Sequence, residues 1–265
     1  MASPILVTGG TGTLGRLLVP HLHAAGRSVR VLSRAHHDDT AGIEFVTGDL
    51  ATGVGLDAAV ASVATIVHCA SSFKGDVQAT RHLVRAALAG GMRPHLVFVS
   101  IVGIDSAPIT GLARGAFGYL VSKLDAERVI TGCGLPWTIL RATQFYDLLL
   151  PAGGLAKLPL VPVPAGLRFQ PIDPAEVAER LATLALGAPA GRAADIGGPR
   201  AATFAELIRT YLRVVGRPRP LVQIPVPGKF ARAIRQGALL VPSDLASDGA
   251  PGRKTWEEFV TERTR

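Results

Sequence analysis

The glycine-rich segment near the start of the chain restricts the possible fold more than any other feature. The apolar run Ile5–Thr8 has the composition of a strand, and the segment that follows it, TGGTGTLGR, leads into an amphipathic helical pattern. The glycine spacing can be counted from Gly9 or from Gly10, with Gly12 and Gly15 shared by both readings. One glycine permits a sharp turn, Gly12 lets the backbone approach phosphate oxygens, and Gly15 lets the helix pack closely on the strand.

A strand, a glycine turn and a helix in this order are typical of a site for the pyrophosphate of a dinucleotide. The first N–H groups of the helix are free, and the helix dipole favours negative charge at that end. Glycine turns also follow strands where no ligand binds, but this one both ends a strand and opens a helix. We therefore expect NAD(P) to bind along Gly9, Gly10, Thr11, Gly12, Thr13, Leu14 and Gly15.

Apolar runs and helical patterns alternate through the first half of the chain. The runs lack the polar alternation of a half-exposed sheet, which indicates parallel strands covered by helices on both faces. Right-handed crossovers then give a doubly wound parallel (Rossmann) sheet of the α/β class. The expected strands are 5–8, 28–33, 44–47, 65–69, 96–100 and 137–140, and the expected helices are 14–25, 56–63, 76–89 and 117–131.

The second half opens with a region rich in proline and glycine. The segment 151–166 predicts a substrate lid rather than a regular element. Helices are expected at 174–186, capped by Asp173, and at 203–215, where Thr203 and Glu206 form a capping box. A short strand is expected at 194–197.

The domain organisation expected from these patterns is a single NAD(P)-binding domain over residues 1–265. Its dinucleotide-binding core is expected at 1–142, and a smaller C-terminal substrate lobe at 143–170 and 200–265.

Composition and charge argue against several other classes of protein. The formal charge is +8, but the arginines are scattered and no basic run contains interleaved aromatic residues, so we expect no nucleic-acid partner. The apolar stretch 148–167 carries Lys157 and four prolines, which argues against a membrane span. With no targeting pattern before Ile5, we expect a cytoplasmic protein. Cys69 and Cys133 are isolated, so neither a disulfide framework nor a metal site is expected.

Arg34 indicates which nicotinamide cofactor the chain prefers. It lies 19 residues after Gly15, where an NAD-specific protein places a carboxylate for the ribose 2′-hydroxyl. A positive side chain there favours the 2′-phosphate of NADP, and Arg16 is a second candidate ligand. The alternative is a solvated arginine at a strand end, with Asp38 and Asp39 as competing carboxylates. Farther along, Asp49 and Leu50 are expected beside the adenine ring, although Gly-Asp is also an ordinary turn sequence.

Tyr119 and Lys123 are the candidate catalytic pair. They stand four residues apart on an expected helix, so both project on one face. An ammonium beside a phenol is expected to lower the phenol pKa, which suits proton donation to a carbonyl that receives hydride. Ser100, at the end of a strand, is expected to orient the same carbonyl. The alternatives are a chance pairing for Tyr119 and Lys123, and a turn cap toward Gly103 for Ser100.

The residues Gln144, Phe145 and Tyr146, which follow the last expected core strand, are candidates for substrate contact. Gln144, Phe145 and Tyr146 follow Arg141 closely and should lie at the carboxyl edge of the sheet, where ligands of such sheets bind. A role in packing is an equal alternative.

Taken together, these segments resemble the short-chain dehydrogenase/reductase superfamily, and more closely its atypical NmrA-like branch of NAD(P)H-binding proteins. The matching segments are 8–15, 48–50, 99–103, 119–123 with Glu127, 134–141, 170–173 and 197–199. The resemblance implies a seven-stranded sheet, a C-terminal substrate lobe, and NADP bound along 9–15, Arg34, Asp49 and Lys123. We also place Ala70 among the cofactor-binding residues. The Asn-Asn-Ala-Gly stretch of the best-known members is replaced here by 68–72, so their asparagine-assisted proton relay does not carry over.

The function expected from the sequence is that of an NADPH-dependent oxidoreductase. Its partner would be an apolar small molecule whose carbonyl, quinone or activated double bond receives hydride, with Tyr119 as the acid, Lys123 as pKa tuner and ribose ligand, and Ser100 as an orienting donor. A non-catalytic NADP(H) sensor and an epimerase or dehydratase of the sugar-nucleotide type are the alternatives. The expected assembly is a monomer or a homodimer.

Overall fold

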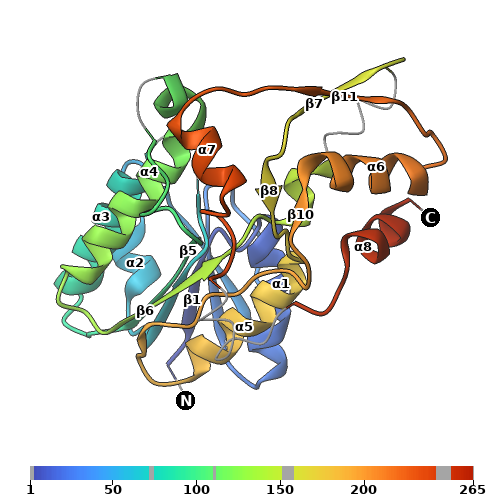
Figure 1. Ribbon diagram of the computed structural model, residues 1–265. Helices are drawn as coiled ribbons and strands as arrows, with labels where there is room; N and C mark the ends of the chain where they lie inside the picture. The colour runs from blue at the N-terminus through green and yellow to red at the C-terminus, as the bar shows by residue number, and fades with distance from the viewer. Residues whose placement is uncertain (1–2, 72–74, 110–111, 151–157, 243–251, 265) are drawn as a thin grey trace. The chain divides into compact units, whose positions relative to one another are not determined.

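A seven-stranded sheet organises the first part of the computed structural model (Figure 1). Its strands lie in the order β3 (Ile43–Thr47), β2 (Val29–Ser33), β1 (Ile5–Thr8), β4 (Thr65–His68), β5 (His95–Ile101), β6 (Trp137–Ala142) and β9 (Gly191–Arg192). Strand β1 pairs in parallel with β2 on one side and with β4 on the other. Chain order therefore reverses between β1 and β4, which confirms the expected doubly wound α/β fold.

The structure describes residues 3–71, 75–109, 112–150, 158–242 and 252–264, with the backbone alone for 112–117. The chain forms two compact units. The first comprises residues 1–100, 117–140 and 177–193, and the second comprises 101–116, 141–176 and 194–265. No helix among the described residues is long and apolar enough to cross a membrane.

Helices cover both faces of the sheet (Figure 1). Helices α1 (Thr13–Ala24) and α5 (Pro174–Leu186) lie over one face, and α2 (Leu56–Val60), α3 (Asp76–Ala89) and α4 (Leu112–Thr131) lie over the other. All four residues of β1 and of β4 are buried, as strands covered on both faces must be.

The apolar face of α3 and α4 explains why these helices pack on the sheet. Leu83 of α3 and Ile130 of α4 are completely buried, and they join Leu6, Ile66 and Leu96 of the strands in one hydrophobic cluster. Each such Leu or Ile side chain contributes about 1.5–3 kcal/mol through removal from water. This cluster fixes the position of α4, which carries the candidate catalytic pair.

The second unit is built from two small sheets and short helices. Strand β7 (Val161–Pro164) pairs in parallel with β11 (Leu221–Ile224), and β8 (Arg168–Phe169) pairs antiparallel with β10 (Ala202–Thr203). The remaining elements are the 3₁₀ turn η1 (Tyr146–Leu148) and helices α6 (Phe204–Val214), α7 (Lys229–Arg235) and α8 (Trp256–Arg263).

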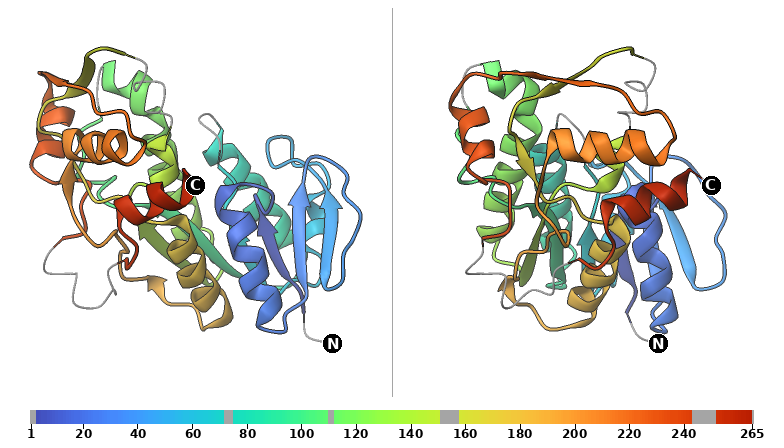
Figure 2. Two further views of the ribbon diagram at one scale, coloured as in Figure 1. Left: turned by 90° about the vertical axis from the view of Figure 1, so that its right-hand side faces the viewer. Right: turned by 45° about the vertical axis from the view of Figure 1, so that its right-hand side comes forward.

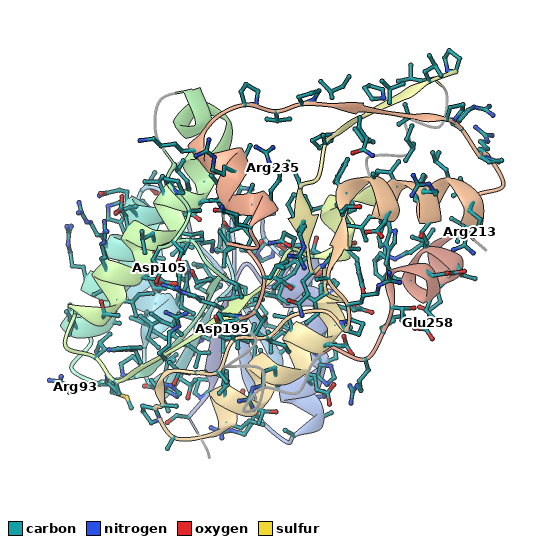
Figure 3. The ribbon with its side chains drawn as sticks, in the orientation of Figure 1. Arg93, Asp105, Asp195, Arg213, Arg235 and Glu258 are labelled. Atoms are coloured by element: carbon teal, nitrogen blue, oxygen red, sulfur yellow. The ribbon has the colours of Figure 1, made fainter. Side chains whose placement is uncertain are left out.

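Helices α6 and α8 lie side by side in this unit (Figure 2). Trp256 and Phe259 of α8 pack with Leu207 of α6 in a hydrophobic cluster. At its rim Arg213 of α6 extends toward α8, which carries Glu258, and donates to both carboxylate oxygens of Glu257 at 3.0 and 2.9 Å (Figure 3). The paired geometry sets the register of the two helices, while the exposed ion pair itself adds little stability.

Most expected elements are confirmed, with small shifts at their ends. The capping box of Thr203 and Glu206 is present at the start of α6. The expected strand at 194–197 is displaced, because the regular strand is β9 (Gly191–Arg192). Within 194–197 the chain still follows β6, where Ile196 forms an isolated bridge to Ala142 and its N–H donates to the carbonyl oxygen of Arg141 at 2.9 Å. Residues 151–157 of the expected lid lie outside the described residues, and part of the remainder forms β7.

The division into units differs from the expected boundaries. Residues 101–116, which the sequence placed in the dinucleotide-binding core, group with the second unit. The reason lies in a close backbone approach: Gly103 has φ +71, and a Cβ there would overlap the carbonyl group of Ala238. Because Gly103 packs this closely against residues 238–239, the segment 101–116 groups with the second unit.

Candidate active site

The glycine turn after β1 has the geometry expected of a phosphate-binding loop. Gly9 makes the turn with φ +70, and a Cβ on it would lie 2.6 Å from the backbone nitrogen of Ala70. A Cβ on Gly15 would overlap the carbonyl oxygen of Gly9, so Gly15 permits the close approach of α1 to the turn. A Cβ on Gly10 would lie 2.7 Å from Val31 Cγ1, whereas one on Gly12 would meet only the carbonyl oxygen of Gly9 at 3.2 Å, so both readings of the glycine spacing remain possible.

The N-terminus of α1 is open to an anion. Gly12 is its N-cap, no side chain caps the helix, and its first turn contains no acidic residue. The free N–H groups and the helix dipole thus face the turn without a competing carboxylate. The side chains of Thr11 and Thr13 are exposed beside it.

The reversal of strand order places Ala70 next to this turn. Ala70 follows β4, the neighbour of β1, and its N–H donates to Thr8 Oγ1 at 3.4 Å. Ligands of doubly wound sheets bind at the carboxyl ends of the strands where the order reverses. Gly9 and Ala70 lie at that point, so the structure brings these two predicted cofactor residues together.

His68 ties the ends of β1, β4 and α3 to one another. Its Nδ1 lies 2.7 Å from Thr8 Oγ1, and its Nε2 lies 3.2 Å from Thr80 Oγ1. Thr80 donates its own hydrogen to the carbonyl oxygen of Asp76 at 2.7 Å, so it must accept from His68 Nε2–H. Thr8 then donates to Nδ1. Burial lowers the pKa of His68 to about 3, aided by the positive charge of Lys123, so the ring is neutral at pH 7.

Asp76 and Lys123 form a buried ion pair in the first unit. Asp76 Oδ2 lies 3.8 Å from Lys123 Nζ, and the two side chains are 4% and 3% exposed. Lys123 Nζ also donates to the carbonyl oxygen of Val99 at 3.4 Å and lies 4.6 Å from the centre of the Phe98 ring. The residue that the sequence assigned to the ribose is thus held against β5.

Tyr119 is linked to this ion pair through Ser71. The phenol of Tyr119 is hydrogen-bonded to Ser71, and Ser71 Oγ donates to Asp76 Oδ2 at 2.8 Å. The ring centre of Tyr119 lies 5.9 Å from Lys123 Nζ. Tyr119, Ser71, Asp76 and Lys123 therefore form one connected group on α4, on α3 and after β4.

The pKa of Tyr119 is shifted in the direction opposite to the expected one. Burial raises it, the hydrogen bond with Ser71 opposes the rise, and the negative charge of Asp76 raises it further. The expectation of a lowered phenol pKa is wrong, because burial of the phenol raises the pKa and the negative charge of Asp76 adds to the rise. A raised pKa keeps the phenol protonated at neutral pH.

Burial affects the neighbouring ionisable groups as well. It lowers the pKa of Lys123, against the opposing charges of Asp76, Cys69 and Glu127. It raises the pKa of Cys69 to about 12, with Lys123 opposing, so this thiol is not a nucleophile at neutral pH. Among the described residues, no cluster of three or more His, Cys, Asp or Glu side chains is placed to hold a metal.

Ser100 carries a buried hydroxyl with no visible partner. It lies on β5, is 3% exposed, and its Oγ makes no hydrogen bond within the described part of the chain. The expected alternative, a cap on the turn toward Gly103, is not formed. Because a buried hydroxyl without a partner is unfavourable, Ser100 suits a bound molecule that accepts or donates there. Its neighbour Val99 is the residue whose carbonyl holds Lys123.

Of the residues expected near the adenosine half, Arg34 follows β2, Asp49 and Leu50 follow β3, and Arg16 lies in the first turn of α1. Arg34 and Arg16 are both exposed. Asp49 Oδ1 accepts a hydrogen bond from the N–H of Ala51 at 2.9 Å. Leu50 is partly buried and packs against the hydrophobic cluster of the strands, α3 and α4. The competing carboxylate of Asp39 is engaged elsewhere, since Oδ1 accepts the N–H of Phe45 at 2.7 Å.

The three residues expected at the substrate belong to the second unit. Gln144 Nε2 donates to the carbonyl oxygen of Leu239 at 3.3 Å, and Phe145 is half-buried. Tyr146 is 1% exposed, donates to the carbonyl oxygen of Lys254 at 2.8 Å, and packs in the hydrophobic cluster of α6 and α8. Within this unit Tyr146 is a core residue.

Sequence reasoning missed Asp76, Ser71 and the linking role of His68. Asp76 was visible only as an acidic residue at the start of a helix, where acids are common for their interaction with the helix dipole. Its burial beside Lys123, 47 residues away, leaves no signal in a single sequence.

Comparison with known proteins finds an NAD(P)H-binding family and relatives that are named as reductases. Residues 9–183, more than half of the chain, match the model of a family described as NAD(P)H-binding. A "(4-alkanoyl-5-oxo-2,5-dihydrofuran-3-yl)methyl phosphate reductase" of Streptomyces griseus is 31% identical over 221 residues, covering 81% of this chain and 74% of that protein. An NAD(P)H azoreductase of Xenophilus azovorans is 28% identical over 285 residues, covering 97% and 96%.

A solved structure shares the fold over nearly the whole chain. The NADPH complex of an NADPH-dependent quinone oxidoreductase from Escherichia coli superposes with a TM-score of 0.80 at 18% identity, covering 98% of this chain and 100% of that one.

Proposed function

Because the chain belongs to the NAD(P)H-binding family, we propose that it is an NADPH-dependent oxidoreductase acting on an apolar small molecule. The acceptor is a carbonyl, a quinone or an activated double bond. The observation that supports this proposal best is the pairing of Tyr119 and Lys123 on α4, with the unpartnered hydroxyl of Ser100 on β5 one residue from the carbonyl that holds Lys123.

The residues present fit a nicotinamide dinucleotide. The approach of Gly9 to Ala70 leaves no room for a Cβ, and the uncapped start of α1 offers free N–H groups for the pyrophosphate. Arg34 and Arg16 are exposed and available to the 2′-phosphate of NADPH, and Asp49 and Leu50 would flank the adenine. When bound, NADPH supplies the hydride.

Tyr119 is the proposed proton donor. Its raised pKa keeps the phenol protonated at neutral pH, as a general acid must be before it acts. Ser100 would donate a hydrogen bond to the substrate atom that gains negative charge, because its hydroxyl has no other use in the described structure. Lys123, fixed by Asp76 and Val99, would hold the ribose hydroxyls and keep Tyr119 in place.

The relatives named above support hydride transfer to unsaturated acceptors. One is a reductase of a dihydrofuranone phosphate, another an azoreductase, and the solved structure is that of a quinone oxidoreductase. These acceptors share a polarised double bond, which is the class proposed here. Gln144 and Phe145 of the second unit are kept as proposed substrate residues, whereas Tyr146 is not.

The test is NADPH oxidation by the purified protein with a panel of small quinones, aromatic aldehydes, azo dyes and conjugated ketones. We expect consumption of NADPH to match formation of the reduced product one to one. NADPH binding without oxidation by any member of the panel would support the sensor alternative. A product isomerised or dehydrated without net oxidation of NADPH would support an epimerase or dehydratase.

A further inference from the structure

We infer that Ser71, positioned by Asp76, is the route by which Tyr119 regains a proton from solvent after each turnover. This inference rests on the proposed function, in which Tyr119 gives its proton to the substrate. It assigns a role to two residues that lie outside the expected Tyr-Lys pair.

The geometry provides a continuous path from the phenol to water. Tyr119 is half-buried and hydrogen-bonded to Ser71, while Ser71 itself is exposed. Ser71 Oγ donates to Asp76 Oδ2 at 2.8 Å, so the carboxylate fixes the serine oxygen beside the phenol. A serine hydroxyl can accept one proton while it donates another, which is what a relay group requires.

Asp76 is itself held rigidly for this task. Lys123 Nζ lies 3.8 Å from Oδ2, and the main-chain oxygen of Asp76 accepts from Thr80, which His68 orients in turn. Gly75, with φ +105, sets the start of α3 at this point. The ammonium of Lys123 offsets the charge of this buried carboxylate, so Asp76 can hold the Ser71 hydroxyl in place between turnovers.

The protons balance through one turnover. Reduction adds one hydride and one proton to the substrate, and the Tyr119 O–H bond breaks as a new O–H, N–H or C–H bond forms on the substrate. The Ser71 hydroxyl then turns from Asp76 to the phenolate, and its O–H bond breaks as the phenol O–H bond forms. The serine oxygen takes a proton from a hydronium ion of the solvent, which supplies the one proton that reduction consumes. Asp76 stays ionised throughout, and its negative charge raises the proton affinity of the phenolate.

The path through Ser71 takes the place of the asparagine-assisted proton relay, which does not carry over to this chain. The segment after β4 reads His68-Cys69-Ala70-Ser71, and its histidine is used in the neutral clamp between Thr8 and Thr80. Cys69 has a pKa raised to about 12 and carries no proton to the site. Glu127 and Lys123, which also face this region from α4, are buried, whereas Ser71 is open to water.

The decisive variant is Ser71→Ala, compared with Ser28→Ala, another exposed serine of the first unit. With the panel compound that the wild type reduces fastest, we expect single-turnover reduction with enzyme in excess to stay within about twofold of wild type. Steady-state turnover should fall by about tenfold or more, with a larger solvent deuterium effect, because reprotonation becomes limiting. Added imidazole should restore turnover of Ser71→Ala and leave Ser28→Ala unchanged, since a small buffer can replace a missing relay group.

A second measurement does not depend on activity. The absorbance of phenolate, titrated in the wild type and in Tyr119→Phe, isolates the pKa of Tyr119. Ser71→Ala should raise this pKa, and Asp76→Asn should lower it, whereas Asp57→Asn, at the exposed start of α2, should leave it unchanged. Opposite shifts support a connected group of phenol, serine and carboxylate.

The outcomes separate the relay from the function. If the wild type oxidises NADPH and Tyr119→Phe does not, but Ser71→Ala turns over normally without imidazole, the relay is wrong and the function stands. If the wild type oxidises no NADPH with the panel, the function itself fails. Absence of any shift of the Tyr119 pKa in Ser71→Ala would also overturn the relay.

Discussion

The carboxylate of Asp76 lies 3.8 Å from the ammonium of Lys123, and both side chains are almost completely buried. The pair joins the start of α3 to the middle of α4, two helices that meet on the same face of the sheet. Its carboxylate also adds to the rise in the Tyr119 pKa that burial of the phenol causes. The ion pair is therefore both a structural link and the electrostatic setting of the site.

Breaking this pair should destabilise the protein strongly. Asp76→Asn leaves the Lys123 ammonium buried without its partner, which costs about 3–5 kcal/mol, whereas the double variant Asp76→Asn/Lys123→Met should recover most of that loss. Urea unfolding at pH 7 measures both. A loss within about 0.5 kcal/mol, the range of ordinary surface substitutions, would show that the pair is not buried as described.

His68 should make stability depend on pH below neutrality. Its pKa is about 3 in the folded protein and 6.5 in the unfolded chain, so the unfolded state binds the proton first. The contribution is complete above pH 6.5 and is lost as pH falls toward 3, by up to about 1.4 kcal/mol for each pH unit. Unfolding free energies at pH 7, 6 and 5 should therefore fall less steeply for His68→Gln than for wild type. His95, whose pKa is also lowered by burial, remains in both proteins and serves as an internal control.

Arg34 should decide the choice between NADPH and NADH. A charge-assisted hydrogen bond to the 2′-phosphate contributes about 1.5–3 kcal/mol, so NADPH should bind about 10-fold to 100-fold tighter than NADH. Arg34→Asp should reverse the order, while Arg85→Asp, exposed on α3, should not. Fluorescence titration measures the affinity of each of the three proteins for both nucleotides, and equal binding of both nucleotides by the wild type would refute this assignment.

Gly15 should be required for cofactor binding. A Cβ at this position overlaps the carbonyl of Gly9, so Gly15→Ala must push α1 away from the turn and weaken NADPH binding by about tenfold or more. Gly90→Ala is the matched control, because its added Cβ would meet only ordinary contacts, the nearest at 3.6 Å. Comparable NADPH affinities of the two variants would mean that the turn does not hold the pyrophosphate.

The sheet and its helices could be predicted because their residues repeat with regular periods. The buried strands β1 and β4 are uninterrupted apolar runs, and the TGGTGTLG turn fixes where α1 begins. The small elements of the second unit were harder. Strand β7 alternates prolines with valines, and β11 gains its partner from a segment about sixty residues earlier, which local patterns do not record.

The candidate site could be predicted in part. Tyr119 and Lys123 are found from their spacing, because both lie on one helix. Ser71 lies in the segment after β4, and Asp76 lies on α3. Both reach Tyr119 and Lys123 only through the packing of α3 against the sheet. The Tyr119 pKa is raised mainly because the phenol is buried, and the negative charge of Asp76 adds to the rise.

The central claim is that Tyr119 gives the proton during reduction, and turnover of Tyr119→Phe tests it most directly. Loss of the phenol should lower turnover by roughly 10² to 10⁴ while NADPH affinity stays nearly unchanged, because the hydroxyl acts in the transition state rather than on the cofactor. Tyr211→Phe, in the second unit, is the matched control and should retain wild-type turnover. A loss of less than about tenfold in Tyr119→Phe would contradict the account and assign the proton to another donor.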